Sequence, residues 1–239
     1  MLRRLNAPLS EEAERINREY ARRERELPSD LYVLRRPENF YFHSETARAC
    51  IELLNDAGCF PLTHKRILDV GCGAGMWPLE FVQWGASPAL LAGVDLDQSR
   101  LEVASSRLPE ADFVQSDAAS LPWPDAHFDL VSQFTVFSSI LDPEVRGLVA
   151  REMFRVVRPG GLILWFDFLV NNPCNPAVRG VPAGEVNTLF PTCQASGRKV
   201  LLAPPLARRI APLSWLMLQF FGSLTILRTH YAAALRRPL

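Results

Sequence analysis

A glycine-rich turn between a predicted strand and a predicted helix constrains the fold of this chain most. Residues 66–70 form a short apolar run, and residues 71–75 read Gly-Cys-Gly-Ala-Gly before a helical segment predicted at 77–85. Glycines at such a turn let the backbone approach a ligand closely. The amides at the start of the following helix are free to bind that ligand. We therefore expect a ligand site at this turn.

Short apolar runs alternate with helical segments along the rest of the chain. This alternation predicts a doubly wound α/β fold, in which helices cover both faces of a mostly parallel sheet of seven strands. The turn Arg158-Pro-Gly-Gly161 is expected to precede the fifth strand. The predicted strands are 66–70, 90–95, 112–116, 128–134, 162–166, 199–203 and 226–231, and the helices between them are 77–85, 97–108, 143–157 and one across 213–227.

Two helices are predicted before the glycine turn. Ser10 is a plausible N-cap for an amphipathic helix that ends at Leu27, before Pro28, and acidic residues follow it in the first turn. A second helix is expected from Ser44 to a stop at Gly58.

The charge of the chain is balanced overall but unevenly distributed. The 239 residues include 26 basic and 26 acidic side chains, and 48% are hydrophobic, which excludes a disordered chain. Residues 1–170 carry 18 basic and 25 acidic side chains, whereas residues 171–239 carry eight basic residues and one acid. The C-terminal part is therefore expected to face something anionic, unless it packs on the acidic body.

The cysteine pattern and the hydropathy favour a soluble cytoplasmic protein. The five cysteines, Cys174 among them, form no CxxC pair and no metal-type spacing, which indicates free thiols in a reducing compartment. The first residues lack the apolar core of a signal peptide. The most hydrophobic segment, 213–227, is shorter than the about 20 residues that span a bilayer.

The spacing of the glycines distinguishes two classes of ligand. The dinucleotide fingerprint G-x-G-x-x-G would need glycine at position 76, which is Met76 here. Asp95 closes the second strand, where a carboxylate can accept both hydroxyls of a ribose. Asp117 follows the third strand, close to where an adenine amino group needs an acceptor.

Four ordered motifs carry a resemblance to a known family. They are LDVGCGAG (68–75), GVDLD (93–97), SDAASLPWPDAHFDLV (116–131) and FRVVRPGG (154–161). Over residues 64–170 the chain resembles the class I S-adenosylmethionine-dependent methyltransferases, most of all the small-molecule branch with the ubiquinone/menaquinone-type enzymes. The resemblance implies S-adenosylmethionine as cofactor and methyl transfer to a small molecule.

The resemblance also implies roles for individual residues, although acids that merely cap helices around a buried turn are the alternative. The methionine moiety and its ammonium would lie on Asp69, Gly71 and Gly73, the ribose on Asp95, the adenine on Leu96, Asp117 and Ala118, and Gln133 would border the methionine and the acceptor.

The resemblance and the charge pattern together predict three parts of the chain. Residues 1–60 form helices that cover the pocket. Residues 61–170 form the S-adenosylmethionine-binding core. Residues 171–239 form a basic segment that completes the sheet and lines the substrate site.

Catalysis by such an enzyme needs few specialised side chains. The sulfonium donor is already activated, so the protein must mainly align the acceptor and exclude water. A base is needed only if the acceptor must lose a proton. Asp167 and His230, each near a strand end, are the candidate bases, and a helix cap and a polar strand end are their alternatives. No metal is expected.

The flanking segments suggest the chemistry of the acceptor. His43 lies among aromatic residues that can close over the cofactor, and Arg208 and Arg228 suit a phosphate or carboxylate. With the apolar segment 213–227, they predict an anionic, partly apolar small molecule that is methylated on oxygen or carbon. The same residues fit a peripheral membrane contact, and an ordinary core helix is the alternative.

Two other functions remain open at this point. One is a nicotinamide-dependent oxidoreductase that uses the same turn, and the other is a non-catalytic S-adenosylmethionine-binding partner subunit. Nucleic acid is not expected as a partner, because residues 132–139 lack the Asn/Asp-Pro-Pro-aromatic motif of nucleic-acid amino-methyltransferases.

Overall fold

The computed structural model describes residues 3–4, 10–28, 30–172 and 175–239. Cys174 and most of the first nine residues, on which the expectations of a free thiol and of no signal peptide partly rest, lie outside the described residues. The four other cysteines, Cys50, Cys59, Cys72 and Cys193, are free thiols.

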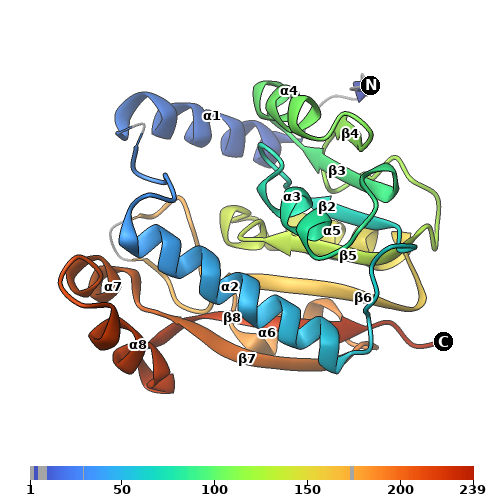
Figure 1. The fold of residues 1–239 in the computed structure, drawn as a ribbon. Coiled ribbons are helices and arrows are strands. Elements are labelled where there is room, and N and C mark those ends of the chain that lie inside the picture. Colours follow the sequence, from blue (N-terminus) through green and yellow to red (C-terminus); the bar gives the residue numbers. More distant parts are fainter. Residues whose placement is uncertain (1–2, 5–9, 29, 173–174) are drawn as a thin grey trace.

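A single twisted sheet forms the centre of the molecule (Figure 1). Strands β2 to β6 are parallel, and β8 runs antiparallel between β6 and β7. The predicted seven-stranded α/β sheet is confirmed, and the two-residue β1 extends its edge beside β4. The order across the sheet is β1 (Arg3–Arg4), β4 (Asp112–Gln115), β3 (Leu91–Asp95), β2 (Ile67–Val70), β5 (Phe128–Phe134), β6 (Val157–Phe168), β8 (Arg228–Arg236) and β7 (Gln194–Leu202).

Helices cover both faces of this sheet and enclose two apolar cores. One core packs buried residues of α2 (Pro37–Asp56), α3 (Met76–Gln83) and α4 (Gln98–Arg107) against the sheet. The other core contains α5 (Pro143–Val156) and α6 (Ala183–Leu189). The fully buried strand β2 explains why its sequence is a continuous apolar run rather than an alternating one.

Helix α1 (Glu11–Glu26) begins and ends as predicted. Ser10 adopts an extended backbone, and its Oγ accepts a hydrogen bond from the amide of Ala13. Leu27 ends the helix in an extended conformation, immediately before Pro28. In Figure 1 this helix lies apart from α2, above the edge of the sheet at which β3 and β4 end.

Several predicted boundaries were wrong. Helix α2 begins at Pro37, well before Ser44, because proline suits the first helical turn, where its missing amide costs nothing. The expected turn at Arg158–Gly161 belongs to β6. It lies where the pairing of β6 with β5 shifts register, between Phe128 and Leu130 of β5. The segment 213–227 is not one helix. It contains α8 (Trp215–Ser223) and a 3-10 turn (Thr225–Leu227), and α7 (Pro204–Ile210) precedes it.

None of the helices within the described residues is long and apolar enough to cross a membrane.

Candidate functional site

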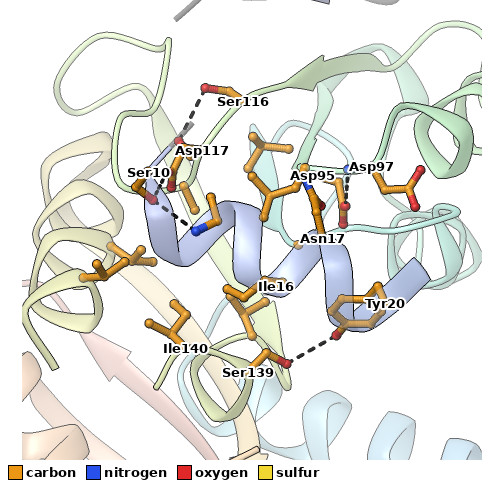
Figure 2. Close-up of a pocket in the computed structure, with 18 of the residues that line it drawn as sticks. Ser10, Ile16, Asn17, Tyr20, Asp95, Asp97, Ser116, Asp117, Ser139 and Ile140 are labelled. Carbon is orange, nitrogen blue, oxygen red and sulfur yellow. Dashed lines mark hydrogen bonds between the residues drawn. The ribbon is translucent and has the colours of Figure 1, made fainter. Parts of the chain in front are cut away.

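A pocket of about 790 Å³, counting its open mouth, lies where β3, β4 and β5 end. Figure 2 shows α1 running across this pocket, where Ile16, Asn17 and Tyr20 line it and the hydroxyl of Tyr20 is directed toward Ser139. Open α/β sheets bind ligands at the carboxyl ends of their strands, so the pocket lies where the fold predicts a site.

Gly71, the first residue of the glycine turn after β2, lines the pocket. Gly71, Gly73 and Gly75 have φ angles of +70°, +52° and +80°, which favour glycine. A Cβ on Gly71 would lie 2.4 Å from Cγ2 of Val136, so the turn and the loop after β5 pack directly against each other. This close approach explains why no larger residue fits at position 71.

Asp95 connects the end of β3 to the glycine turn. Its Oδ2 accepts a hydrogen bond from the amide of Gly73 over 2.8 Å, and its Oδ1 accepts one from the amide of Asp97 over 2.9 Å. Burial raises the pKa of this carboxyl above its usual value, although both amide hydrogen bonds act in the opposite direction. Each carboxylate oxygen keeps a lone pair with which to accept a ligand hydroxyl.

The loop after β4 forms the opposite end of the pocket. Asp117 accepts hydrogen bonds from Ser10 Oγ at Oδ2 over 2.7 Å and from the amide of Ala119 at Oδ1 over 2.9 Å. Leu96 and Ala118 line the pocket between the two acids. The structure thus brings together five predicted cofactor residues, Gly71, Asp95, Leu96, Asp117 and Ala118.

Three other predicted cofactor residues lie next to the pocket rather than in its lining. Asp69 is buried beneath the glycine turn, where it accepts a hydrogen bond from Ser132 Oγ over 2.7 Å, and burial raises its pKa to about 8. Gly73 uses its amide to bind Asp95. Gln133 is fully buried, and its amide group bonds to the backbone of Val136 and Phe166.

The sequence analysis predicted that helices of residues 1–60 cover the pocket, but it named none of the α1 residues that line it. Tyr20 lies at the pocket, where its hydroxyl is 3.3 Å from Ser139 Oγ and the guanidinium of Arg100 lies 4.7 Å from its ring centroid. Ile16 and Asn17 also line the pocket. The apolar stripe of this helix predicted a buried face, but no sequence pattern indicates which cavity such a face covers.

Thr135, directly after β5, has an unusual backbone conformation. Its φ is +60°, which is strained for a β-branched residue. The amide of Thr135 donates to the carbonyl of Phe166 over 2.8 Å, and this bond fixes the conformation. Because Thr135 lines the pocket, the strain lies at the candidate site, where such conformations concentrate.

The two candidate bases lie outside the pocket lining. Asp167 is fully buried and accepts hydrogen bonds from the amides of Ser138 and Phe168, over 3.1 and 2.8 Å. Burial raises its pKa to about 6. His230 is buried between Phe166 and Phe168, and burial lowers its pKa to about 3. Asp167 thus binds the loop that carries Ser138, and His230 lies among aromatic rings, while the assignment of the two as bases stays a prediction.

The three predicted substrate residues are also outside the pocket lining. His43 Nε2 lies 2.8 Å from Glu80 Oε1, and its ring stacks on Trp77, which stacks in turn on the pocket residue Phe134 at 3.9 Å. Arg228, the first residue of β8, donates to the carbonyls of Gly222 in α8 and Lys199 in β7. Arg208 is exposed on α7.

The side chains of the described residues include no group of three or more His, Cys, Asp or Glu that is arranged to hold a metal ion.

Comparison with known proteins agrees with this geometry. Residues 67–161 match a family model described as a methyltransferase domain. The chain is 37% identical over 113 residues to the phthiotriol/phenolphthiotriol dimycocerosates methyltransferase of Mycobacterium tuberculosis H37Ra, a match that covers 46% of this chain and 40% of the relative. It is 35% identical over 128 residues to the fatty-acid O-methyltransferase of Mycolicibacterium smegmatis, a match that covers 53% of this chain and 41% of the relative. The chain thus spans about two fifths of the length of these relatives.

A solved structure with the same fold is that of a SAM-dependent methyltransferase from Methanosarcina mazei. The TM-score is 0.56 at 19% sequence identity, and the match covers 75% of this chain and 98% of the other. At this identity the likeness concerns the fold. The domain match over residues 67–161, the relatives and this fold support the resemblance to the class I S-adenosylmethionine-dependent methyltransferases.

Proposed function

We propose that the protein binds S-adenosylmethionine in this pocket and transfers its methyl group to a small, partly apolar acceptor. The observation that carries the proposal is the connection between the glycine turn and the strand-end acid. The amide of Gly73 binds Asp95, so the turn and the ribose-binding acid form one unit at the pocket. That unit fits a nucleoside better than a pyrophosphate, whose negative charge a buried carboxylate would repel.

The residues present fit the cofactor. Asp95 offers carboxylate oxygens for the ribose hydroxyls, and Leu96 and Ala118 offer apolar contacts for the adenine. Asp117 retains acceptor capacity beyond its bonds to Ser10 and Ala119. Beneath the turn, Asp69 is the carboxyl group that would balance the ammonium of the methionine moiety. Its raised pKa reflects burial without a cation, and a bound ammonium would lower it.

The cofactor supplies an electrophilic methyl group on a sulfonium, whose charge is lost as the methyl is transferred. The protein's own side chains mainly position the reactants and exclude water. Helix α1 covers the pocket with Ile16 and Tyr20. Asp167 and Arg146 fix the loop after β5 from below, through Ser138 and Ile140. Neither Asp167 nor His230 lines the pocket, so we expect an acceptor that needs no base from these two residues.

The relatives support an acceptor with an apolar part. Their names refer to a fatty acid and to dimycocerosates of phthiotriol. In this chain, the stacked rings of Phe134 and Trp77 form an apolar wall beside the glycine turn. Arg208 and Arg228 lie outside the pocket lining, so an acidic group on the acceptor is supported by the name of the fatty-acid relative alone. We therefore propose a long-chain acid or a comparable lipid intermediate as the acceptor class, with methylation on oxygen.

Calorimetry and a transfer assay together test this proposal. The purified chain is expected to bind S-adenosylmethionine and S-adenosylhomocysteine and to ignore NADH. A tritiated methyl group is then expected to appear on a long-chain fatty acid but not on an oligonucleotide. Binding of NADH instead would favour an oxidoreductase. Tight cofactor binding without transfer to any acceptor would favour a non-catalytic partner subunit.

A further inference from the structure

An apolar surface lies exposed at the corner of the molecule formed by α8 and the turns around it. Leu216 and Ile226 expose 82% and 90% of their area, although leucine and isoleucine are among the residues most often buried. We call this set the α8 surface, and it comprises Leu213, Trp215, Leu216, Met217, Phe220, Leu224 and Ile226. Exposed apolar side chains gathered on one short segment of the chain are typical of an interaction site.

Helix α8 is anchored so that these side chains stay outside. Leu218 is fully buried and fixes the inner face of the helix. Trp215 packs against Phe40 and Tyr41 of α2, with ring centroids 6.0 and 6.1 Å apart. Ser214 caps the helix by accepting a hydrogen bond from the amide of Met217. The exposure is therefore a property of a packed helix and not of a loose segment.

Two exposed arginines lie on the helix next to the α8 surface. Arg208 and Arg209 are exposed in the last turn of α7, which contacts α8. No acidic residue follows Glu185 in the sequence, so α7, α8 and the strands on either side contain none. Figure 1 shows α7 and α8 packed together at the lower left of the molecule. Apolar side chains beside exposed arginines are the combination that binds anionic lipid surfaces.

We propose that the α8 surface docks on a bilayer that contains anionic lipids. The apolar side chains would enter the boundary between headgroups and acyl chains, and Arg208 and Arg209 would bind lipid phosphates. A second copy of this chain is a poorer occupant. A two-fold contact through the same surface would bring the arginines of both copies to one interface, without acids on α7 or α8 to balance them.

The position of the surface agrees with an enzyme that acts on lipids. Figure 1 places α7 and α8 beyond the same edge of the sheet as α1, which covers the pocket. A molecule that binds the membrane there would have its cofactor pocket at the lipid-facing edge. Only this point rests on the proposed function, because docking itself does not require methyl transfer.

Vesicle flotation tests the proposal with the intact chain. Phosphatidylcholine vesicles with added phosphatidylglycerol are the probe, and pure phosphatidylcholine vesicles are the control. We expect binding to the anionic vesicles that weakens as salt is raised, and binding at least about tenfold weaker to the neutral ones. Leu216→Glu with Ile226→Glu, and separately Arg208→Glu with Arg209→Glu, are each expected to weaken the binding by about tenfold or more.

Matched changes on α5 control for fold and charge. Leu148 and Arg151 are exposed on that helix, outside the pocket lining, so Leu148→Glu and Arg151→Glu are expected to leave vesicle binding unchanged. Circular dichroism and S-adenosylmethionine affinity show whether each variant is folded. Because affinity is measured without vesicles, failure of docking is distinguishable from failure of the proposed function.

Three results would overturn the proposal. The first is a folded wild-type chain that stays unbound with anionic vesicles at low salt. The second is an equal loss of binding in the α5 variants. The third is a dimer in light scattering that Leu216→Glu separates while vesicles have no effect, which would assign the surface to a second copy of the chain.

Discussion

Ser10 Oγ donates a hydrogen bond to Asp117 Oδ2 over 2.7 Å, joining the start of α1 to the loop after β4. The same hydroxyl accepts a hydrogen bond from the amide of Ala13 and so caps the helix. One side chain therefore starts α1 and fixes it over the end of the pocket that holds Asp117 and Ala118. The covering helix is part of the site rather than an appendage to it.

Replacing Ser10 tests this connection. Ser10→Ala removes the helix cap and the bond to Asp117, and it should lower the free energy of unfolding by about 1 kcal/mol. Affinity for S-adenosylmethionine should fall by about fivefold, as measured by calorimetry. Ser106→Ala is the control, because that exposed hydroxyl bonds only within α4. Equal affinities in all three proteins would show that α1 does not help to form the site.

The carboxyl group of Asp69 should lower the stability of the folded chain as it ionises, but it should strengthen the binding of S-adenosylmethionine. Burial raises its pKa from 3.8 to about 8, so the folded chain retains a proton that the unfolded chain has lost. The stability from this proton is present at low pH and is lost as the pH rises through about 8. Asp69→Asn cannot ionise and should show a smaller fall in Tm than the wild type between about pH 6 and about pH 9.

The same variant should bind S-adenosylmethionine at least about tenfold more weakly, because an amide cannot balance an ammonium charge. Calorimetry at neutral pH measures this loss. An Asn variant that keeps full affinity would show that Asp69 serves only the fold.

His230 should make the fold sensitive to acid. Burial lowers its pKa to about 3. As the pH falls below about 6.5, His230 is therefore protonated in the unfolded chain but stays neutral in the folded chain. The stability from neutral His230 is present above about pH 6.5 and falls as the pH is lowered, by about 2 kcal/mol at pH 5. Denaturant unfolding of wild type and His230→Phe at both pH values measures the difference. If both proteins lose the same stability on acidification, His230 does not carry this effect.

Arg146 should be more important for stability than its position on a helix suggests. It is fully buried, and its guanidinium donates to the carbonyls of Ile140 and Arg179 and to Glu185 Oε1, over 2.6, 3.2 and 2.7 Å. Arg146→Ala should lower the free energy of unfolding by about 3 kcal/mol, because it removes three hydrogen bonds of a buried guanidinium.

An exposed arginine provides the comparison. Arg158 pairs with Asp129 at 2.7 Å while 45% of its side chain is exposed, and Arg158→Ala should cost at most about 1 kcal/mol. If urea unfolding shows a similar loss in the free energy of unfolding for both variants, Arg146 is no more important for stability than an exposed arginine.

The core of the fold and the cofactor end of the site were predictable because local patterns determine them. Glycines with positive φ, a buried strand before them and an acid at the next strand end are all visible in the sequence. Parallel strands bring their ends together, so Gly71, Asp95 and Asp117 had to meet once the strands were recognised.

The surroundings of the candidate bases and substrate residues were not predictable in the same way. Arg228 and His230 lie at alternate positions of β8, and only the register with β6 and β7 decides what surrounds them. That register places His230 opposite Phe168 in an aromatic stack. It also leaves Arg228 beside the carbonyl of Lys199. Likewise, Asn17 and Tyr20 reach the pocket only because α1 docks across it, a long-range contact without a local signal.

Cofactor binding by Asp95→Ala tests the central claim most directly. Asp95 connects the glycine turn to the pocket, so its loss should weaken S-adenosylmethionine binding by about a hundredfold in calorimetry, equivalent to about 3 kcal/mol. Asp125→Ala, at a side chain that is 80% exposed and remote from the pocket lining, should bind like the wild type. An Asp95→Ala protein that is folded and binds the cofactor with unchanged affinity would contradict the account.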